Sequence, residues 1–154
     1  MRSAVLGDLY MRECRAFVFV FDPSVRESFA KVVELVEKVY RVKDVETIFG
    51  VLLATKCDTN ARREVEMAEA ETLANDNKMP FFVVSAKTGE GVERAFKIAA
   101  AMGAVDRTSK VGVFGGPAVG KTALVLRFVQ DVFIEEYDPT IENSYRYIIL
   151  YLSY

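Results

Sequence analysis

The sequence predicts an α/β fold with a mostly parallel sheet, on three observations. Short runs of β-branched and aromatic residues recur along the chain with little polar alternation, as in strands that are buried on both faces. Segments with helical spacing of apolar residues lie between these runs. The two kinds of segment alternate, which favours parallel strands covered by helices.

The expected strands are the apolar runs of the chain. They are AFVFVF (16–21), IFGVLLA (48–54), PFFVVS (80–85) and KVGVFG (110–115). The last segment, SYRYIILYLSY (144–154), is aromatic and aliphatic with few charges, and it predicts a further strand at an edge.

Helices are expected between the strands. Ser24 and Glu27 fit a capping box, S-x-x-E, ahead of an apolar stripe that starts at Phe29. Stripes of the same kind start at Met67 and at Val92. The helix over 121–129 is apolar nearly all round, so we expect it to be well buried.

The composition limits the function classes. The chain has 154 residues, of which 51% are hydrophobic, enough for one domain with a real core. The net charge of −2 gives no electrostatic argument for nucleic acid or an anionic membrane. The chain has no histidine and only two cysteines, which argues against a zinc site or a histidine-based triad. No membrane anchor is evident, and we expect a cytoplasmic protein.

The segment GGPAVGKT (115–122) follows a buried run and fits the pattern G-x-x-x-x-G-K-[ST]. In such a loop several backbone N–H groups point at one spot, and the N-terminus of the next helix adds partial positive charge. Lys121 can reach the outer phosphates of a nucleotide, and the Thr122 hydroxyl can bind Mg²⁺. Because the expected strand and helix flank it, we expect a phosphate-binding loop here.

Two further segments bear on the base, since ATPases, kinases and GTPases share this loop. TKCD (55–58) and SAK (85–87) each directly follow an expected strand. Asp58 can accept two hydrogen bonds from N1–H and N2–H₂ of guanine, a donor pair that adenine lacks. The stem of Lys56 can lie over the base, and the Ala86 N–H can donate to the guanine carbonyl. Each segment alone is more often an ordinary turn or cap; together, at parallel strand ends, they favour a guanine pocket.

With these motifs in place, the chain resembles a circularly permuted Ras-superfamily small GTPase. FGGPAVGKTALVLRFVQDVFIEEYDPTIENSYR (114–146) is similar to the Ras phosphate loop, first helix and switch I. YMRECRAFVFVFD (10–22) resembles the end of the switch II helix and the next strand. The resemblance implies a three-layer P-loop NTPase (Ras-like) fold in a single domain, 1–154. Residues 1–102 match the family's C-terminal part, 103–110 form the joint, and 111–154 match its N-terminal part.

The resemblance also implies the ligands, GTP or GDP with Mg²⁺, and the role of each residue. Lys121 and Thr140 would serve catalysis, and Thr122 and Thr140 would bind the metal. Phe133 would pack edge-on against guanine, Tyr137 would lie over the phosphates, and an effector protein would contact 138–145. The implied nucleotide-binding residues are Gly115, Ala118, Val119, Gly120, Lys121, Thr122, Phe133, Tyr137, Thr55, Lys56, Asp58, Ser85, Ala86 and Lys87.

The chain departs from the family pattern in three places. Thr55 replaces the usual asparagine, as it does in some subfamilies. Pro117 and Ala118 stand where many Ras proteins have two glycines, and proline removes an N–H donor. No D-x-x-G-Q segment occurs within 1–154. In the family that segment supports Mg²⁺, senses the γ-phosphate and orients the attacking water, so we expect slow hydrolysis or none.

The missing segment also affects the expected sheet. In the family its strand lies between the phosphate-loop strand and the strand that matches 144–154. We consider three outcomes: the strand 144–154 pairs directly with the phosphate-loop strand, a partner chain supplies a strand, or the chain is part of a longer one. An open edge of this kind predicts a dimer.

The sequence thus predicts a guanine-nucleotide-binding switch of the small-GTPase type. It leans toward a GTP phosphohydrolase with impaired turnover. The alternatives are a pseudo-GTPase module that holds nucleotide permanently, an ATP-using P-loop enzyme, and an engineered or truncated permutant.

Overall fold

The computed structural model describes residues 2–105, 108–135 and 147–153, and within them the predicted α/β architecture is confirmed. One five-stranded sheet has the order β3-β2-β1-β4-β5. The first four strands are parallel to their neighbours, and β5 is antiparallel to β4. The strands are β1 (Ala16–Phe21), β2 (Gly50–Ala54), β3 (Phe81–Val83), β4 (Thr108–Gly115) and β5 (Tyr147–Ser153).

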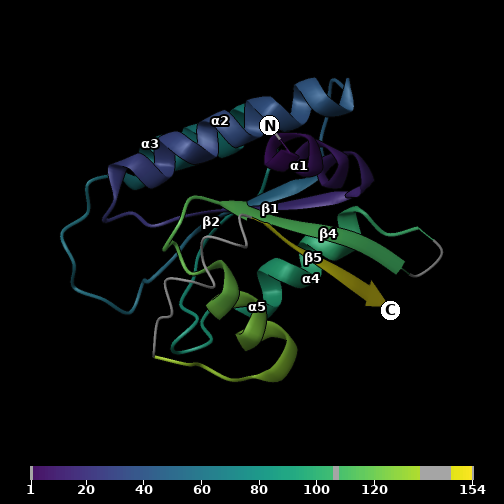
Figure 1. Cartoon of the computed structure of the whole chain (residues 1–154). Helices are drawn as coiled ribbons and strands as arrows, with labels where there is room; N and C mark the ends of the chain where they lie inside the picture. The colour runs from purple at the N-terminus through teal and green to yellow at the C-terminus, as the bar shows by residue number, and fades with distance from the viewer. Residues whose placement is uncertain (1, 106–107, 136–146, 154) are drawn as a thin grey trace.

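Helices cover both faces of this sheet and make three layers (Figure 1). On one face lie α1 (Arg2–Glu13), α2 (Arg26–Lys43) and α3 (Met67–Asp76). On the other lie α4 (Val92–Met102) and α5 (Lys121–Gln130). No helix in the described part of the chain is both long and apolar enough to cross a bilayer.

The central strand β1 divides the core into two clusters by its alternation. Phe17, Phe19 and Phe21 point to the face covered by α2 and α3, where they pack among buried side chains of those helices. Ala16, Val18 and Val20 point to the opposite face, against α4 and α5. All six residues of the strand are buried, which is why the run shows no polar alternation.

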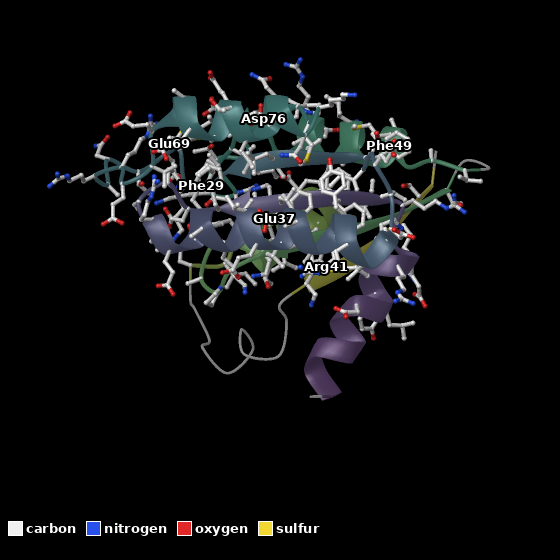
Figure 2. All side chains as sticks on the ribbon, turned by 90° about the horizontal axis from the view of Figure 1, so that it is seen from above. Phe29, Glu37, Arg41, Phe49, Glu69 and Asp76 are labelled. Atoms are coloured by element: carbon white, nitrogen blue, oxygen red, sulfur yellow. The ribbon has the colours of Figure 1, made fainter. Side chains whose placement is uncertain are left out.

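The pair α2 and α3 lies side by side over the sheet, as the view from above in Figure 2 shows. Arg26 at the start of α2 donates from both terminal nitrogens to the carboxylate of Glu69 on α3, each at 2.7 Å. Glu69 also closes a capping box with Glu66, the N-cap residue of α3. A bidentate pair of hydrogen bonds between Arg26 and Glu69 therefore links the two helices.

The capping box predicted at Ser24 and Glu27 is wrong. Helix α2 begins at Arg26 with Val25 as its N-cap residue, and Val25 has no side-chain oxygen to offer. Ser24 instead donates from its N–H and its hydroxyl to Asp22, at 2.9 and 2.7 Å. The N–H of Arg26 is bound by Glu64 at 2.9 Å, so the cap comes from a residue distant in the sequence.

The outcome at the sheet edge is the direct pairing considered above. β5 pairs antiparallel with the phosphate-loop strand β4 along its whole length, from Phe114 opposite Tyr147 to Thr108 opposite Ser153. β4 itself begins at Thr108, inside the segment assigned to the joint, and an isolated bridge links Thr108 to Val105. The backbone groups of β4 are thus satisfied without an intervening strand, and the edge has moved outward to β5.

Candidate functional site

The parallel strands β1 to β4 deliver their carboxyl ends to one edge of the sheet. Asp22 follows β1, Thr55 and Lys56 follow β2, Ser85 lies just beyond β3, and Gly116 follows β4. Three loops of the predicted pocket therefore come together at the edge where parallel α/β sheets bind ligands.

The phosphate loop, residues 115–120, connects β4 to α5 in a tight turn. A Cβ on Gly115 would lie 2.4 Å from the backbone oxygen of Val20, so only glycine fits beside β1. Gly120 is the N-cap residue of α5 with φ +96°, a conformation that glycine adopts without strain. Ala118 also has a positive φ, +60°, a conformation that is uncommon for a residue with a Cβ.

Lys121, the first residue of α5, is buried although it carries a charge. Its ammonium donates to the carbonyl oxygens of Gly115 at 3.0 Å and Gly116 at 2.6 Å. The lysine is thereby held over the concave side of its own loop. In that position the ammonium can exchange its bonds to the carbonyl oxygens for bonds to an incoming phosphate.

Thr122 is exposed in the first turn of α5. A single hydroxyl beside a phosphate site is a donor set that suits Mg²⁺, which keeps several waters and takes its other ligands from phosphate oxygens. The described residues include no cluster of three acidic, cysteine or histidine side chains that would hold a metal by itself. Tyr137, Thr140 and the loop 138–145 lie outside the described residues.

Thr55 joins the loop after β2 to the phosphate loop. It is buried, and its hydroxyl lies 2.9 Å from the carbonyl oxygen of Val119 and 3.1 Å from that of Phe21. Its own N–H also donates to the Phe21 oxygen, at 3.0 Å. A hydroxyl has one proton and donates one such bond at a time. The Phe21 oxygen already accepts the Thr55 N–H, so the bond that only the hydroxyl can supply is the one to Val119.

Lys56 makes a second connection between the same loops. Its ammonium donates to Asp22 at 2.6 Å and to the carbonyl oxygen of Ala118 at 3.2 Å. The side chain of Asp22 is only 4% exposed, whereas that of Lys56 is 46% exposed. The charged end of Lys56 is therefore fixed to the phosphate loop, and its stem is the part predicted to lie over the base.

Asp22 is a residue of this site that the sequence analysis did not identify. Burial alone would raise its pKa, but hydrogen bonds from Lys56 and from the N–H and hydroxyl of Ser24 outweigh that effect and lower it. The carboxylate is thus charged at neutral pH and can hold Lys56 in place. A signal was present, because Asp22 directly follows the central buried strand.

The Asp22→Asn variant is expected to lose about 1.5–3 kcal/mol of unfolding free energy at pH 7, the scale of a hydrogen bond to a charged group. The pKa of Asp22 is lower in the folded protein than in the unfolded chain. Its stabilisation is therefore complete above the unfolded pKa of about 4 and is lost as the pH falls through the lower folded pKa. Urea unfolding between pH 7 and pH 2.5 should show the difference from wild type shrinking below pH ~4.

Glu34→Gln is the matched control for this experiment, because Glu34 pairs with Lys31 on the exposed surface of α2. Exposed pairs contribute little, so this variant should follow wild type across the range. A constant Asp22→Asn deficit down to pH 2.5 would contradict the assigned role of the carboxylate.

The loops after β2 and β3 meet at Asp58. The hydroxyl of the buried Ser85 donates to one carboxylate oxygen of Asp58 at 2.6 Å and accepts the N–H of Thr88 at 3.1 Å. Asp58 is otherwise exposed, so its carboxylate is held by Ser85 and open to a ligand. This arrangement fixes the predicted base-selecting group relative to the predicted Ala86 amide.

Arg127 on α5 is the second residue that the sequence analysis missed. It donates to the carbonyl oxygens of Ala86 and Lys87, at 2.7 and 2.6 Å. The signal was a lone guanidinium in a helix that is otherwise apolar from Ala123 to Val129. That helix is also less buried than predicted: Leu124 is buried, but Val129 is 56% exposed.

Phe133 follows α5 and is half-buried. Nearby, Lys87 and Glu135 form an exposed ion pair at 3.6 Å. The loop after α5 therefore approaches the loop after β3, as a residue that packs against the base would require. The role of Phe133 toward a base stays a prediction.

Comparisons with known proteins agree on one family. The model of the Ras family matches residues 2–103 and 110–151. Circularly permutated Ras protein 1 of Dictyostelium discoideum is 38% identical over 143 residues, which are 93% of this chain and 17% of that protein. Circularly permutated Ras protein 2 of the same organism is 33% identical over 147 residues, 93% of this chain and 4% of that protein.

A third relative, whose name does not mention a permutation, matches part of the chain. Ras-related protein Ral-a of Drosophila melanogaster is 37% identical over 93 residues, which are 60% of this chain and 46% of that protein. The chain thus spans less than half the length of each of these three relatives.

Proposed function

The chain belongs to the Ras family in a circularly permuted form, and from this premise we propose that it is a guanine-nucleotide-binding switch that takes GTP or GDP with Mg²⁺. One observation carries the proposal: the phosphate loop and the loop after β2 are joined at Val119 and Ala118 by Thr55 and Lys56. A ligand that spans both loops, with phosphates at one end and a base at the other, fits this edge.

Different residues at this edge would bind the phosphates, the metal and the base. Lys121 and the N–H groups at the start of α5 would hold the phosphates, and Thr122 would bind the metal. Bound Mg²⁺ would neutralise phosphate charge. Asp58 would accept from guanine N1–H and N2–H₂, and the Ala86 N–H would donate to its carbonyl oxygen. Lys87 and Phe133 would flank the base, and Tyr137, Thr140 and 138–145 would respond to the γ-phosphate and contact an effector.

The proposal also covers the organisation of the chain. Residues 1–154 would act as one domain, with 103–110 as the joint between the family's two ends. β1 from one half lies between β2 and β4, so strands from both halves share one sheet. Dimerisation through the outer edge of β5 stays a prediction, which light scattering at high concentration tests.

The test of nucleotide binding uses the whole chain, purified without chelators. Denaturing the purified protein should release GDP or GTP. When the protein is then loaded with labelled GDP, excess GTP should displace the label and excess ATP should not. Displacement by ATP would instead support an ATP-using enzyme. Release of no guanine nucleotide, with no uptake in the presence of Mg²⁺, would overturn the proposal.

Hydrolysis is expected to be slower than the intrinsic rate of the family, on the order of 10⁻⁴ s⁻¹. Pro117 lies exposed in the phosphate loop and has no N–H to offer the γ-phosphate. Single-turnover hydrolysis of bound GTP measures the rate, and Pro117→Gly, which restores the donor, should increase it. A wild-type rate at the ordinary family value would contradict this expectation.

The runner-up is a pseudo-GTPase that holds its nucleotide as a permanent structural ligand, and Pro117 is the feature that favours it. Exchange of fluorescent mant-GDP separates the two. A switch must release GDP, whereas a structural ligand would stay bound.

A further inference from the structure

We infer that Arg127 is a positioning residue for base selection, acting through the loop 85–90 rather than touching the nucleotide. This inference rests on the proposed function and deepens it. It starts from the placement of a guanidinium on α5, the helix that begins at the phosphate loop, against the loop that would recognise the base.

The guanidinium is a fixed fork between helix and loop. Nε donates to the Ala86 oxygen at 2.7 Å and Nη2 to the Lys87 oxygen at 2.6 Å. Nη1 is occupied by the carboxylate of Asp131 at 3.0 Å, one turn further along. The side chain of Arg127 is 18% exposed, so solvent competes little for these bonds. A planar group with all three nitrogens engaged has one orientation.

The loop passes close to the stem of this arginine at Gly89. Gly89 has φ +84°, and a Cβ built there would lie 3.6 Å from Cδ of Arg127. The Gly89 N–H returns to the Ser85 oxygen at 2.8 Å, which closes the loop. The stem of Arg127 therefore lies beside Gly89, and its guanidinium binds two carbonyl oxygens of the same loop.

The bonds from Arg127 to these carbonyl oxygens connect it to Asp58, the group that would recognise guanine. In a trans peptide the N–H points opposite to the C=O. The peptide whose oxygen binds Nη2 donates its N–H, that of Thr88, to the Ser85 hydroxyl at 3.1 Å, and Ser85 donates to Asp58 at 2.6 Å. A continuous chain of hydrogen bonds thus runs from Arg127 to the base-selecting carboxylate, and bonds in such chains strengthen one another.

The donor side of the pocket lies next to the same fork. The Ala86 N–H makes no hydrogen bond to any residue within the described ranges. Its direction is set by the peptide between Ser85 and Ala86, whose oxygen accepts the Gly89 N–H, while Nε of Arg127 holds the oxygen of the next peptide. Arg127 therefore restrains the backbone at Ala86 from the peptide that follows this donor, which would face the guanine carbonyl.

The test compares nucleotides that differ by one base group. IDP lacks the 2-amino group that Asp58 would bind, and 6-thioguanosine diphosphate offers a poor acceptor to the Ala86 amide. In Arg127→Met, which keeps the stem and removes the donors, the preference for GDP over each analogue should fall about tenfold, the loss of roughly one hydrogen bond. Arg127→Lys, which keeps the charge on a single nitrogen and loses the planar fork, should lie between Met and wild type.

Lys97→Met is the control, because it removes an exposed charge of α4 that pairs with Glu93. It should keep both preferences, and thermal unfolding of the nucleotide-free variants reports any loss of fold. Equal loss of affinity for GDP and both analogues would make Arg127 merely structural and overturn the inference. If Arg127→Met does not fold, the Lys variant decides by the same ratios. Failure of wild type to bind GDP would instead overturn the proposed function.

Discussion

Replacing Lys121 with alanine is expected to weaken GDP binding by about 10²–10⁴-fold. The estimate follows from the loss of two hydrogen bonds to charged phosphate oxygens, at about 1.5–3 kcal/mol each, with ~1.4 kcal/mol for each tenfold change. Lys121 is buried against its own loop, so alanine removes a charged donor from inside the site. Titration with mant-GDP in the presence of Mg²⁺ measures the change.

The free protein should respond to the same substitution. The Gly115 and Gly116 oxygens each accept from the Lys121 ammonium and would lose that donor. Unfilled acceptors at these two buried glycines destabilise the fold, so the unfolding free energy without nucleotide should fall by about 1–3 kcal/mol. Lys97→Met serves again as the variant that removes a charge outside the site. A loss of GDP affinity below tenfold would show that the phosphates do not lie at Lys121.

The sheet could be predicted because its signal is local. The run AFVFVF alternates large and small apolar residues, and the structure places phenylalanines against one helix layer and smaller residues against the other. Strand ends were less certain, since the edge strand β3 covers only Phe81–Val83, with Val83 37% exposed. Local patterns identify an element well but do not show where its neighbours stop pairing.

The start of α2 shows what local patterns miss. Ser24 has the residue type and spacing of a cap, yet Asp22 engages it, and the cap of Arg26 comes from Glu64. The same holds at the site, where Thr55 and Lys56 are near each other in sequence but act on the distant phosphate loop. Contacts between residues far apart in sequence depend on the fold, and no spacing rule encodes them.

The motifs located the site better than they described it. Predicted loop residues lie at one edge of the sheet, and their roles toward a nucleotide stay predictions. Asp22 and Arg127 escaped because they would act on other protein groups, Lys56 and the loop 85–90, rather than on the ligand. Residues that position a site carry no motif of their own.

Thr55→Val is expected to speed GDP release about tenfold and to lower the unfolding free energy by about 1–2 kcal/mol. Valine has the shape of threonine without the hydroxyl. The Phe21 oxygen keeps the backbone N–H of residue 55 as a partner, but the Val119 oxygen loses its bond from the side chain. Since Val119 lies in the phosphate loop, the loss acts directly on the part that would hold the phosphates.

Thr55→Ser is the matched control, because it keeps the hydroxyl and removes only a methyl group. Dissociation of mant-GDP chased with excess GDP gives the release rate, and urea unfolding of the nucleotide-free protein gives the stability. If the serine variant releases GDP as fast as the valine variant, the effect comes from packing and not from the bond to Val119. If neither differs from wild type, the threonine does not couple the two loops, and base and phosphate recognition are independent at this edge.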